Sequence, residues 1–354
     1  MRFTHETLPQ RVVFAPGDAP AAVAREVAAL GARRVMVIAA PAESSLADAV
    51  SAGIPVAVRH DEVVMHVPVE VAERARDAAV KAGADALLCV GGGSTTGLAK
   101  AVALTGSPAE GLPIIAVPTT YAGSEATNVW GLTEGETKTT GVDDRVLPRS
   151  IVYDASLMLT LPPEMSVASG LNAMAHCVDS MWGPRTDPID QALAGEGSHA
   201  LRHGLPAVVA DPSGIEGRER TLYGAYLAAV AFASAGSGMH HKICHVLGGM
   251  YNLPHAQTHA VVLPHVLAFN APNAPEAERR IARALGSATA SEGLADLYAT
   301  VHAPIALRDY GMPEDGLARA VAPIMAAIPE NNPTPVTEEN LTALLRAAWE
   351  GATS

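Results

Sequence analysis

The residues best suited to chemistry in this sequence are histidines that recur at helical spacing. Asn172 and His176 are four residues apart, as are His241 and His245, so each pair would share one face of a helix. His255 follows after a turn, fourteen residues beyond His241. Imidazoles placed in this way could hold a divalent metal ion or donate a proton to a reacting group.

A single histidine on a helix is more often a half-buried packing residue than a ligand. The set taken together favours a functional interpretation, because the surrounding segments are otherwise rich in Ala, Leu, Met and Gly. Such segments would have to bury several ionisable rings, and buried polar groups need partners. We therefore predict a polar site built from these histidines.

A glycine-rich loop is a second candidate site. Residues 89–100 read Cys-Val-Gly-Gly-Gly-Ser-Thr-Thr-Gly-Leu-Ala-Lys and join a predicted strand to a predicted helix. The glycines leave room for a phosphate, and the N-terminus of the helix offers N–H groups and a positive dipole end. The loop matches neither the G-x-G-x-x-G fingerprint nor a P-loop. Taken alone it leaves open a pyrophosphate site or a tight turn with Ser94 as helix cap.

A second polar turn follows the next predicted strand. Residues 118–125 read Pro-Thr-Thr-Tyr-Ala-Gly-Ser-Glu. In a parallel sheet this turn lies at the carboxyl edge, where ligands bind in doubly wound folds. We expect its hydroxyl groups to line the same groove as the glycine loop.

The elements that position these loops alternate along the first 150 residues. Short apolar runs there alternate with Ala-rich stretches of helical spacing, which is typical of parallel strands joined by helices. A helix is predicted over residues 69–82, ending at Gly83. Strands are predicted over residues 35–39, 56–59, 86–90 and 114–117. After Tyr153-Asp154 long Ala, Leu, Met and His segments predict helices instead.

Length and composition agree with two domains. The 354 residues exceed the roughly 250 to 300 at which a single core stops growing. We predict a Rossmann-like α/β domain over residues 1–153 and an all-α domain over residues 154–354. With 24 basic and 37 acidic residues, a net charge of -13 argues against a nucleic-acid binder or a polybasic membrane-surface protein.

The cysteines and the apolar runs indicate the compartment. Cys89, Cys177 and Cys244 are widely spaced, so neither a disulfide framework nor a thiolate zinc site is predicted. The first twenty residues lack the apolar stretch of a signal peptide, and no uncharged apolar run is long enough to span a bilayer. We expect a cytoplasmic protein without membrane or nucleic-acid partners.

The glycine loop, the Pro-Thr-Thr turn and residues 241–255 together resemble the iron-containing alcohol dehydrogenase family. Within it, the turn at 118–125, the stretch Gly-Leu-Asn-Ala-Met-Ala-His at 170–176 and His240-His241-Lys242 look most like maleylacetate reductases. The resemblance runs from about residue 10 to about residue 350. It implies a dehydroquinate synthase-like fold, with a nucleotide-binding α/β domain, a helical catalytic domain and an active site in the cleft between them.

The resemblance also implies roles by position. Cofactor-binding positions are Gly92, Gly93, Ser94, Thr119, Thr120, Ser124 and Lys138. From the chemistry of the side chains we predict that His176, His241, Lys242 and His245 form the catalytic pocket, with Tyr121, Asn172 and His255 near the substrate. The family's metal-ligand positions are Asn172, His176, His241 and His255. His245 matches a histidine beside the nicotinamide that is implicated in proton relay. From the residues alone, Lys242 could equally be an exposed helix charge, and Tyr121 a packing residue.

Three positions depart from the family pattern. Asn172 stands where metal-dependent members carry Asp, so a dication would lose a negative ligand and bind less tightly. Gly97 stands where many relatives have Asp. Ala39-Ala40-Pro41 follows the strand where NAD-selective relatives often place an acidic residue. We therefore expect a site that works without iron or zinc, and the use of both NADH and NADPH.

The expected function is NAD(P)H-dependent reduction of the conjugated C=C bond of maleylacetate to 3-oxoadipate in aromatic-compound catabolism. The substrate would be a small dicarboxylate, and relatives imply a homodimer. Candidate carboxylate clamps are Arg145, Arg149 and Arg185, and nothing in their spacing selects one. Three alternatives stay open: a metal-dependent alcohol or polyol dehydrogenase of the same superfamily, a lyase resembling dehydroquinate synthase, and a non-catalytic metal-binding protein.

Overall fold

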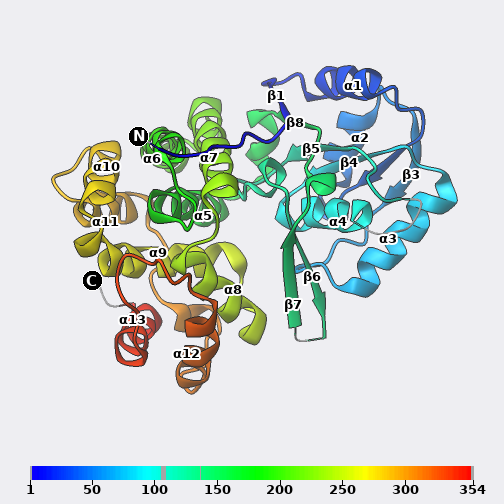
Figure 1. Ribbon diagram of the computed structural model, residues 1–354. Coiled ribbons are helices and arrows are strands. Elements are labelled where there is room, and N and C mark those ends of the chain that lie inside the picture. Colours follow the sequence, from blue (N-terminus) through cyan, green and yellow to red (C-terminus); the bar gives the residue numbers. More distant parts are fainter. Residues whose placement is uncertain (1, 105–108, 136, 352–354) are drawn as a thin grey trace. The chain divides into compact units, whose positions relative to one another are not determined.

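In the computed structural model, which describes residues 2–104, 109–135 and 137–351, the apolar runs of the N-terminal half form a parallel six-stranded sheet. The strand order is β1-β8-β5-β4-β2-β3, and neighbouring strands pair in parallel (Figure 1). The strands are β1 Arg11–Phe14, β2 Val35–Ile38, β3 Val56–His60, β4 Ala86–Gly91, β5 Ile114–Pro118 and β8 Ser150–Tyr153. The four predicted strands are confirmed to within a residue at each end.

Helices cover both faces of this sheet because its strands are apolar on both sides. In β2, Val35 and Val37 pack with one pair of helices, whereas Met36 and Ile38 pack with the other pair. The first pair is α1 Ala19–Leu30 with α2 Ser44–Ser51, and the second is α3 Val69–Ala82 with α4 Gly93–Ala103. The helix predicted over residues 69–82 is therefore confirmed, and Gly83 caps it in the left-handed conformation at a φ of 59°.

The order of the strands defines where a ligand would bind. The chain passes from β2 outward to β3 and then returns to β4 on the other side of β2. The carboxyl ends of β2 and β4 therefore flank a topological switch point, which is the usual ligand site of doubly wound sheets. The glycine loop follows β4 directly.

A two-stranded antiparallel hairpin follows the second polar turn. It consists of β6 Val129–Glu134 and β7 Thr137–Val142. The sequence did not predict this hairpin, nor the sheet strands β1 and β8. Both sheet strands begin with a polar residue, Arg11 or Ser150, which leaves an apolar run of only three residues, whereas all four residues of β2 are apolar.

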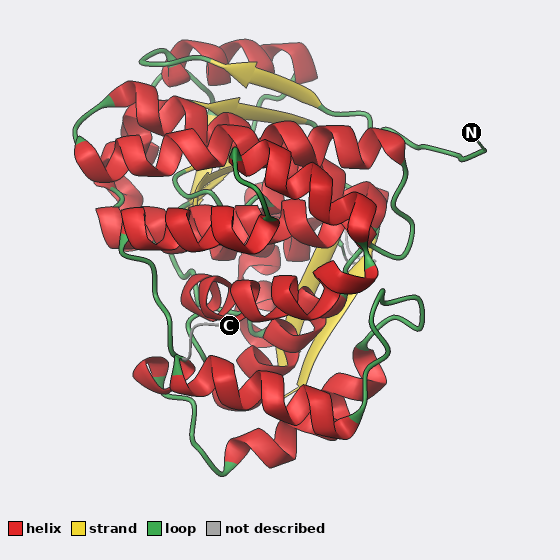
Figure 2. Cartoon of the chain, turned by 90° about the vertical axis from the view of Figure 1, so that its left-hand side faces the viewer, coloured by secondary structure: helices red, strands yellow, loops and turns green. Residues whose placement is uncertain are grey.

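The C-terminal unit consists of helices joined by loops in the part of the chain that the structure describes (Figure 2). Its longest helices are α5 Pro163–Trp182, α6 Pro188–Ala210 and α7 Ile215–Ala235. The others are α8 Met239–Tyr251, α9 His255–Asn270, α10 Pro275–Leu285, α11 Ala290–Val301, α12 Gly316–Ala327 and α13 Glu338–Glu350. The expectation of an all-α second domain agrees with this architecture.

The boundary between the two units differs from the expected position after residue 153. One unit comprises residues 8–161, and the other comprises residues 162–351 together with residues 2–7. Leu157, in the 3₁₀ helix Ala155–Thr160, still packs in the core of the α/β unit. The helical unit begins at Pro162-Pro163, and residues 2–7 join it because His5 bonds to Asp187 at 2.8 Å.

Among the described helices, none alone is long and apolar enough to cross a membrane. The consecutive helices α7 and α8 meet the length and composition criteria only as a pair, with a bend of 97° between them.

Candidate active site

The glycine loop lies directly against the second polar turn. β4 ends at Gly91, and Gly92 is the N-cap of α4. A Cβ on Gly92 would lie 2.9 Å from Cγ2 of Thr120, which explains why this position is glycine. The amide of Thr119 donates a hydrogen bond to the carbonyl oxygen of Gly91 over 3.2 Å. The two turns predicted to bind the cofactor are therefore adjacent.

The loop fits the pyrophosphate of a dinucleotide. Gly93 and Ser94 form the first turn of α4, and no described side chain caps that helix. Its first N–H groups and the positive end of its dipole suit an anion, and Gly92 and Gly93 leave room for the anion to approach. The alternative in which Ser94 caps the helix is wrong, because Ser94 lies inside α4.

Glu43 brings a carboxylate to this loop that sequence inspection missed. It ends the 3₁₀ helix Pro41–Glu43 after β2, and it accepts a hydrogen bond from the hydroxyl of Thr119. A Cβ on Gly91 would collide with Oε2 of Glu43 and with the side chain of Thr95. Burial raises the pKa of Glu43, and the bond from Thr119 opposes that rise. Positions 39–41 carry no acidic residue, as noted from the sequence, but the chain brings the carboxylate of Glu43 to the loop two residues later. The use of both NADH and NADPH stays a prediction.

Lys100 ties the glycine-loop helix to the second turn. Its buried ammonium group donates to the carbonyl oxygens of Ser124 at 2.7 Å, Thr127 at 2.9 Å and Val129 at 2.7 Å. Burial lowers the pKa of Lys100 to about 7, and the nearby buried Glu125 opposes that shift. These bonds fix the backbone between the polar turn and β6, so the turn keeps its place beside the loop.

The other residues of this unit that were expected to contact cofactor or substrate are Thr120, Tyr121, Ser124 and Lys138. Thr120 contacts the glycine loop, and Ser124 supplies the carbonyl oxygen that Lys100 binds. Tyr121 is fully buried. Lys138 lies in β7 opposite Thr133, and its side chain is outside the described part of the structure.

In the helical unit, Asp179 of α5 holds the start of α8. Its carboxylate accepts hydrogen bonds from the amides of Gly238 at 3.1 Å and His241 at 3.2 Å, and from Nδ1 of His241 at 2.7 Å. Burial raises the pKa of Asp179 to about 7, and the amide bonds oppose that rise. An oxygen that accepts several N–H bonds belongs to an ionised carboxylate, so His241 carries a proton on Nδ1.

Six histidine rings lie in a continuous series of contacts around this point, and we call them the imidazole cluster. They are His176, His240, His241, His245, His255 and His259. The rings of His176 and His241 are stacked, with centroids 4.7 Å apart. Nε2 of His240 lies 3.0 Å from Nδ1 of His259, within hydrogen-bond distance. All four histidines singled out from the sequence belong to the cluster.

The imidazole cluster has a buried end and an accessible end. His176, His240, His241 and His259 are buried, His245 is half-buried and His255 is exposed. Burial lowers the pKa of His176 to about 4 and that of His240 to about 3, and neighbouring imidazoles add to the shift of His240. The buried rings are therefore neutral near neutral pH. Protons exchange with solvent at the accessible end of the cluster, through His245 and His255.

Two family profiles match the chain in sequence. The profile described as "Iron-containing alcohol dehydrogenase" matches residues 9–155, and "Fe-containing alcohol dehydrogenase family, C-terminal" matches residues 166–349. The chain belongs to the iron-containing alcohol dehydrogenase family. The glycine loop thus lies in the first matched region of the family, and the imidazole cluster lies in the second.

Members of the iron-containing alcohol dehydrogenase family resemble the chain over its full length. A maleylacetate reductase of Sphingobium indicum is 44% identical over 353 residues, covering 99% of this chain and 98% of the relative. The crystal structure of an iron-containing alcohol dehydrogenase from Corynebacterium glutamicum is 61% identical, with a TM-score of 0.96 and coverage of 99% and 98%. That of a maleylacetate reductase from Agrobacterium tumefaciens is 40% identical, with a TM-score of 0.93 and full coverage of both chains.

The family description implies a metal ion, and the placed rings argue against one ion shared by the family's ligand positions. A metal lies close to the plane of the imidazole that binds it, about 2.0 to 2.1 Å from the nitrogen. The stacked rings of His176 and His241 are within 11° of parallel, so no point near both rings lies in both planes. Asn172 adds only a neutral amide oxygen. His176, His241 and Asn172 therefore do not fit a common dication as they are placed.

Three buried polar atoms nevertheless mark a polar site here. Asn172 Oδ1, His176 Nδ1 and His241 Nε2 have no hydrogen-bond partner among the described residues. A different group, His240, His241 and His259, has ligand nitrogens within 4.8 Å of one another. In that group His240 and His259 already face each other at hydrogen-bond distance. The unsatisfied atoms of α5 and α8 thus mark a polar pocket, in which Asn172 Oδ1 and His241 Nε2 need hydrogen-bond donors from water or a ligand.

Some functional candidates were missed from the sequence, and others receive no support. Asp179 lies three residues after His176, and His259 lies four after His255, so helical spacing could have revealed both. Lys242 makes no ion pair or hydrogen bond with a described side chain, and its role stays a prediction.

The arginines proposed as carboxylate clamps have other partners in two cases. Arg145 pairs with Glu110 and Asp143. Arg185 donates to the carbonyl oxygens of residues 233 and 234. The amide of Arg149 donates a hydrogen bond to the carbonyl oxygen of Ile114. These contacts do not favour any of the three arginines as the group that binds a substrate carboxylate.

Replacing Lys100 by methionine should destabilise the α/β unit strongly. Lys100→Met would leave three buried or partly buried carbonyl oxygens without their donor, so we expect the free energy of unfolding to fall by about 3 to 5 kcal/mol. Chemical denaturation followed by circular dichroism measures it. The control Lys81→Met changes an exposed lysine of α3 and should alter stability by less than about 0.5 kcal/mol. Equal effects of the two changes would contradict the role given to Lys100.

Proposed function

We propose that the chain is an NAD(P)H-dependent reductase that converts maleylacetate to 3-oxoadipate in the catabolism of aromatic compounds. Relatives named maleylacetate reductase are 41% to 45% identical over nearly the whole chain. The glycine loop suits a dinucleotide, and the imidazole cluster suits a reaction that needs hydrogen bonds and a proton. The substrate is a small dicarboxylate, and the partners predicted by resemblance are limited to a second copy of the chain in the cytoplasm.

The observation that carries this proposal is the set of three buried, unsatisfied polar atoms in the helical unit. Asn172 Oδ1, His176 Nδ1 and His241 Nε2 lack partners within the described chain. Buried polar groups are normally hydrogen-bonded, and leaving one unsatisfied costs roughly 1 to 3 kcal/mol. Asn172 Oδ1 and the lone pair of His241 Nε2 accept hydrogen bonds. Ordered water molecules that donate both to these atoms and to the carboxylate oxygens of a bound substrate would satisfy them.

The chemistry follows the movement of charge. When bound, the reduced nicotinamide supplies a hydride to the alkene carbon β to the ketone. The electron pair of the C=C bond shifts, and negative charge collects on the ketone oxygen as an enolate. The protein must then donate hydrogen bonds to that oxygen and a proton to the α-carbon. The product gains two hydrogens and keeps its ketone.

We assign the proton donor to His245. Asp179 holds His241 with its proton on Nδ1, so Nε2 of the neutral ring offers a lone pair instead of a proton. His245 is half-buried, and its ring centroid lies 6.0 Å from that of His241 and 6.5 Å from that of exposed His255. Solvent can reprotonate His245 through this end of the imidazole cluster, whereas His241 serves to position the ligand.

We also propose that turnover does not require a bound metal. Conjugate reduction places its charge on an enolate that hydrogen bonds can stabilise, whereas oxidation of an alkyl alcohol benefits from a Lewis acid. The neutral Asn172 and the stacked rings of His176 and His241 suit the first reaction. The alternative is a metal-dependent alcohol or polyol dehydrogenase, which the group of His240, His241 and His259 would favour.

The reaction and its metal independence are tested together. The purified chain should oxidise NADH with freshly made maleylacetate and show no turnover with glycerol or lactaldehyde. Activity should stay within about twofold after treatment with EDTA, because hydrogen bonds replace the Lewis acid. Loss of activity on chelation that Fe²⁺ or Zn²⁺ restores would favour the alcohol dehydrogenase. Absence of net NADH oxidation with any of these substrates would contradict the reductase and favour a lyase.

Replacing the proposed proton donor should slow the chemical step. We expect His245→Gln to lower kcat by about a hundredfold or more, with little change in the KM for NADH, because glutamine cannot supply a proton. Steady-state kinetics with both substrates measures the two effects. His199→Gln, at an exposed histidine of α6, is the matched control and should leave kcat unchanged. An unaltered kcat in His245→Gln would require another acid.

Glu43 should affect the choice between the two cofactors. NADPH carries an additional 2′-phosphate, and a carboxylate at the glycine loop would repel it. Glu43→Gln should therefore raise the ratio of kcat/KM for NADPH to that for NADH by about three- to tenfold. Glu73→Gln, at an exposed residue of α3, is the control. A ratio that does not change in Glu43→Gln would place the 2′-phosphate outside the influence of this carboxylate.

A further inference from the structure

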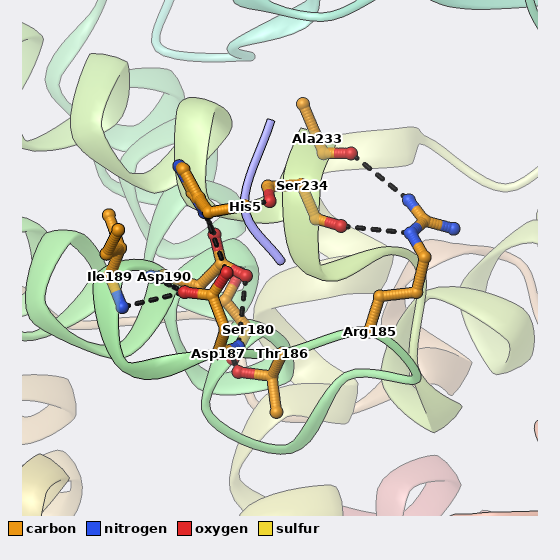
Figure 3. A network of polar contacts seen from close by, with 9 residues as sticks. All are labelled: His5, Ser180, Arg185, Thr186, Asp187, Ile189, Asp190, Ala233 and Ser234. Carbon is orange, nitrogen blue, oxygen red and sulfur yellow. Dashed lines mark hydrogen bonds and ion pairs between the residues drawn. The ribbon is translucent and has the colours of Figure 1, made fainter. Parts of the chain in front are cut away.

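A second group of polar side chains lies in the helical unit, among residues outside the imidazole cluster. His5 comes from the N-terminal segment, Asp187 and Asp190 from the start of α6, and Ser234 from the end of α7 (Figure 3). The side chains of Asp187 and Asp190 are 4% and 0% exposed, and that of His5 is 9% exposed. Two buried carboxylates thus share one small space with an imidazole.

The start of α6 explains only half of this arrangement. Asp187 and Asp190 form a capping box, in which Oδ1 of Asp187 accepts from the amides of Ile189 at 2.7 Å and Asp190 at 3.0 Å. Oδ2 of Asp190 accepts from the amide of Asp187 at 3.2 Å. The capping box therefore uses one oxygen of each carboxylate. The other two oxygens, Asp187 Oδ2 and Asp190 Oδ1, face the ring of His5.

A single imidazole nitrogen cannot satisfy both of these oxygens. Nδ1 of His5 lies 2.8 Å from Oδ2 of Asp187, 3.5 Å from the hydroxyl of Ser234 and 3.7 Å from Oδ1 of Asp190. Its one hydrogen can point at Asp187, and 3.7 Å is too long for a second hydrogen bond. Oδ1 of Asp190 is buried and makes no hydrogen bond of normal geometry with the described residues, although the hydroxyl of Ser234 lies close enough to influence the carboxylate.

No cationic side chain of the described chain other than His5 balances the two carboxylates. Neither Asp187 nor Asp190 forms an ion pair with a described lysine or arginine. The nearby Arg185 turns to the carbonyl oxygens of Ala233 and Ser234 instead (Figure 3). Burial and the adjacent charge of Asp187 raise the pKa of Asp190, and the Ser234 hydroxyl opposes the rise. The dipole of α6 offsets only about half a charge.

We propose that His5, Asp187, Asp190 and Ser234 form a binding site for a small first-row divalent cation, with Zn²⁺ the best fit. The ligand atoms would be Nδ1 of His5, Oδ2 of Asp187, Oδ1 of Asp190 and the hydroxyl oxygen of Ser234. The first three already lie within 4.8 Å of one another. One imidazole with carboxylate and hydroxyl oxygens is a donor set that zinc accepts.

The spacing of the donors supports a tetrahedral ion. Zinc bonds of about 2.0 to 2.1 Å place neighbouring ligands of a tetrahedron roughly 3.3 to 3.4 Å apart. The distances from Nδ1 of His5 to the three oxygens, 2.8, 3.5 and 3.7 Å, lie on both sides of that value. An ion at the centre would need only small side-chain shifts, and it would bind the oxygen of Asp190 that lacks a partner.

Such an ion would hold the N-terminal segment to the helical unit. His5 is 182 residues from Asp187 in sequence. Within the described residues 2–7, ion-pair contacts are made by His5 alone, to Asp187 and at longer distance to Asp190. The ion would therefore stabilise the helical unit and the segment together, whereas the proposed chemistry uses other residues. The inference does not rest on the proposed reductase activity.

The experiment measures zinc content directly. The full-length chain, first stripped with EDTA, is dialysed against buffered Zn²⁺, and bound zinc is measured by mass spectrometry. We expect His5→Gln and Asp190→Asn each to bind about one zinc fewer per chain than the unaltered protein. His199→Gln, another histidine change in the same unit, should bind as much as the unaltered protein. Any zinc held by the imidazole cluster contributes equally to all four samples.

Thermal unfolding with and without Zn²⁺ gives a second readout. Zinc should raise the Tm of the unaltered protein and of His199→Gln by more than that of His5→Gln, because an ion that binds only the folded state stabilises it. His5 lies in a terminal segment, so His5→Gln decides the question even where Asp190→Asn fails to fold. The same zinc content in His5→Gln as in the unaltered protein would overturn the proposal, whatever the outcome of the assay with maleylacetate.

Discussion

The arrangement of the helical unit's site depends on one buried carboxylate. Asp179 accepts N–H bonds from the first turn of α8 and from the ring of His241, so it fixes the helix and the imidazole at once. Gly238, the N-cap of α8, supplies no side-chain cap, and a Cβ there would lie 2.6 Å from Oδ1 of Asp179. A glycine at the helix start and an aspartate on the neighbouring helix therefore form one capping device made from distant parts of the sequence.

The charge of this carboxylate limits what the rest of the site can contain. The N–H groups around Asp179 balance it, and the buried imidazoles remain neutral because burial disfavours their charged forms. Asn172 lies seven residues before Asp179 on the same face of α5, and it adds an amide without charge. A carboxylate at position 172 would add an unbalanced negative charge and favour a cation nearby. The asparagine removes that demand and keeps this part of the pocket neutral.

The sequence predicted features whose cause is local and missed those whose cause is tertiary. The glycine loop and the helix over residues 69–82 could be predicted because glycine conformations and apolar periodicity act within a few residues. The helical spacing of the histidines likewise predicted a polar site, and the rings of His176, His241 and His245 do lie in contact. The position of Glu43 beside the glycine loop could not be predicted, because its contact with Thr119 joins residues that are 76 positions apart in the sequence. The hairpin strands contain Gly, Thr and charged residues, and β1 and β8 each begin with a polar residue, so none of them has the continuous apolar run that revealed β2.

Asp179 and Asp190 show how the number of donors per oxygen decides what a buried carboxylate needs. Each oxygen of Asp179 faces at least one backbone N–H, with Oδ1 reached by the amide of His240 at 3.4 Å. That carboxylate is complete without a cation. Asp190 has the same burial, but its helix start supplies a donor to Oδ2 only, and the nearest imidazole hydrogen goes to Asp187. Asp179 in α5 therefore has a backbone donor for each of its oxygens and serves a structural role. Asp190 in α6 has a backbone donor for one oxygen only, so its other oxygen can bind a ligand.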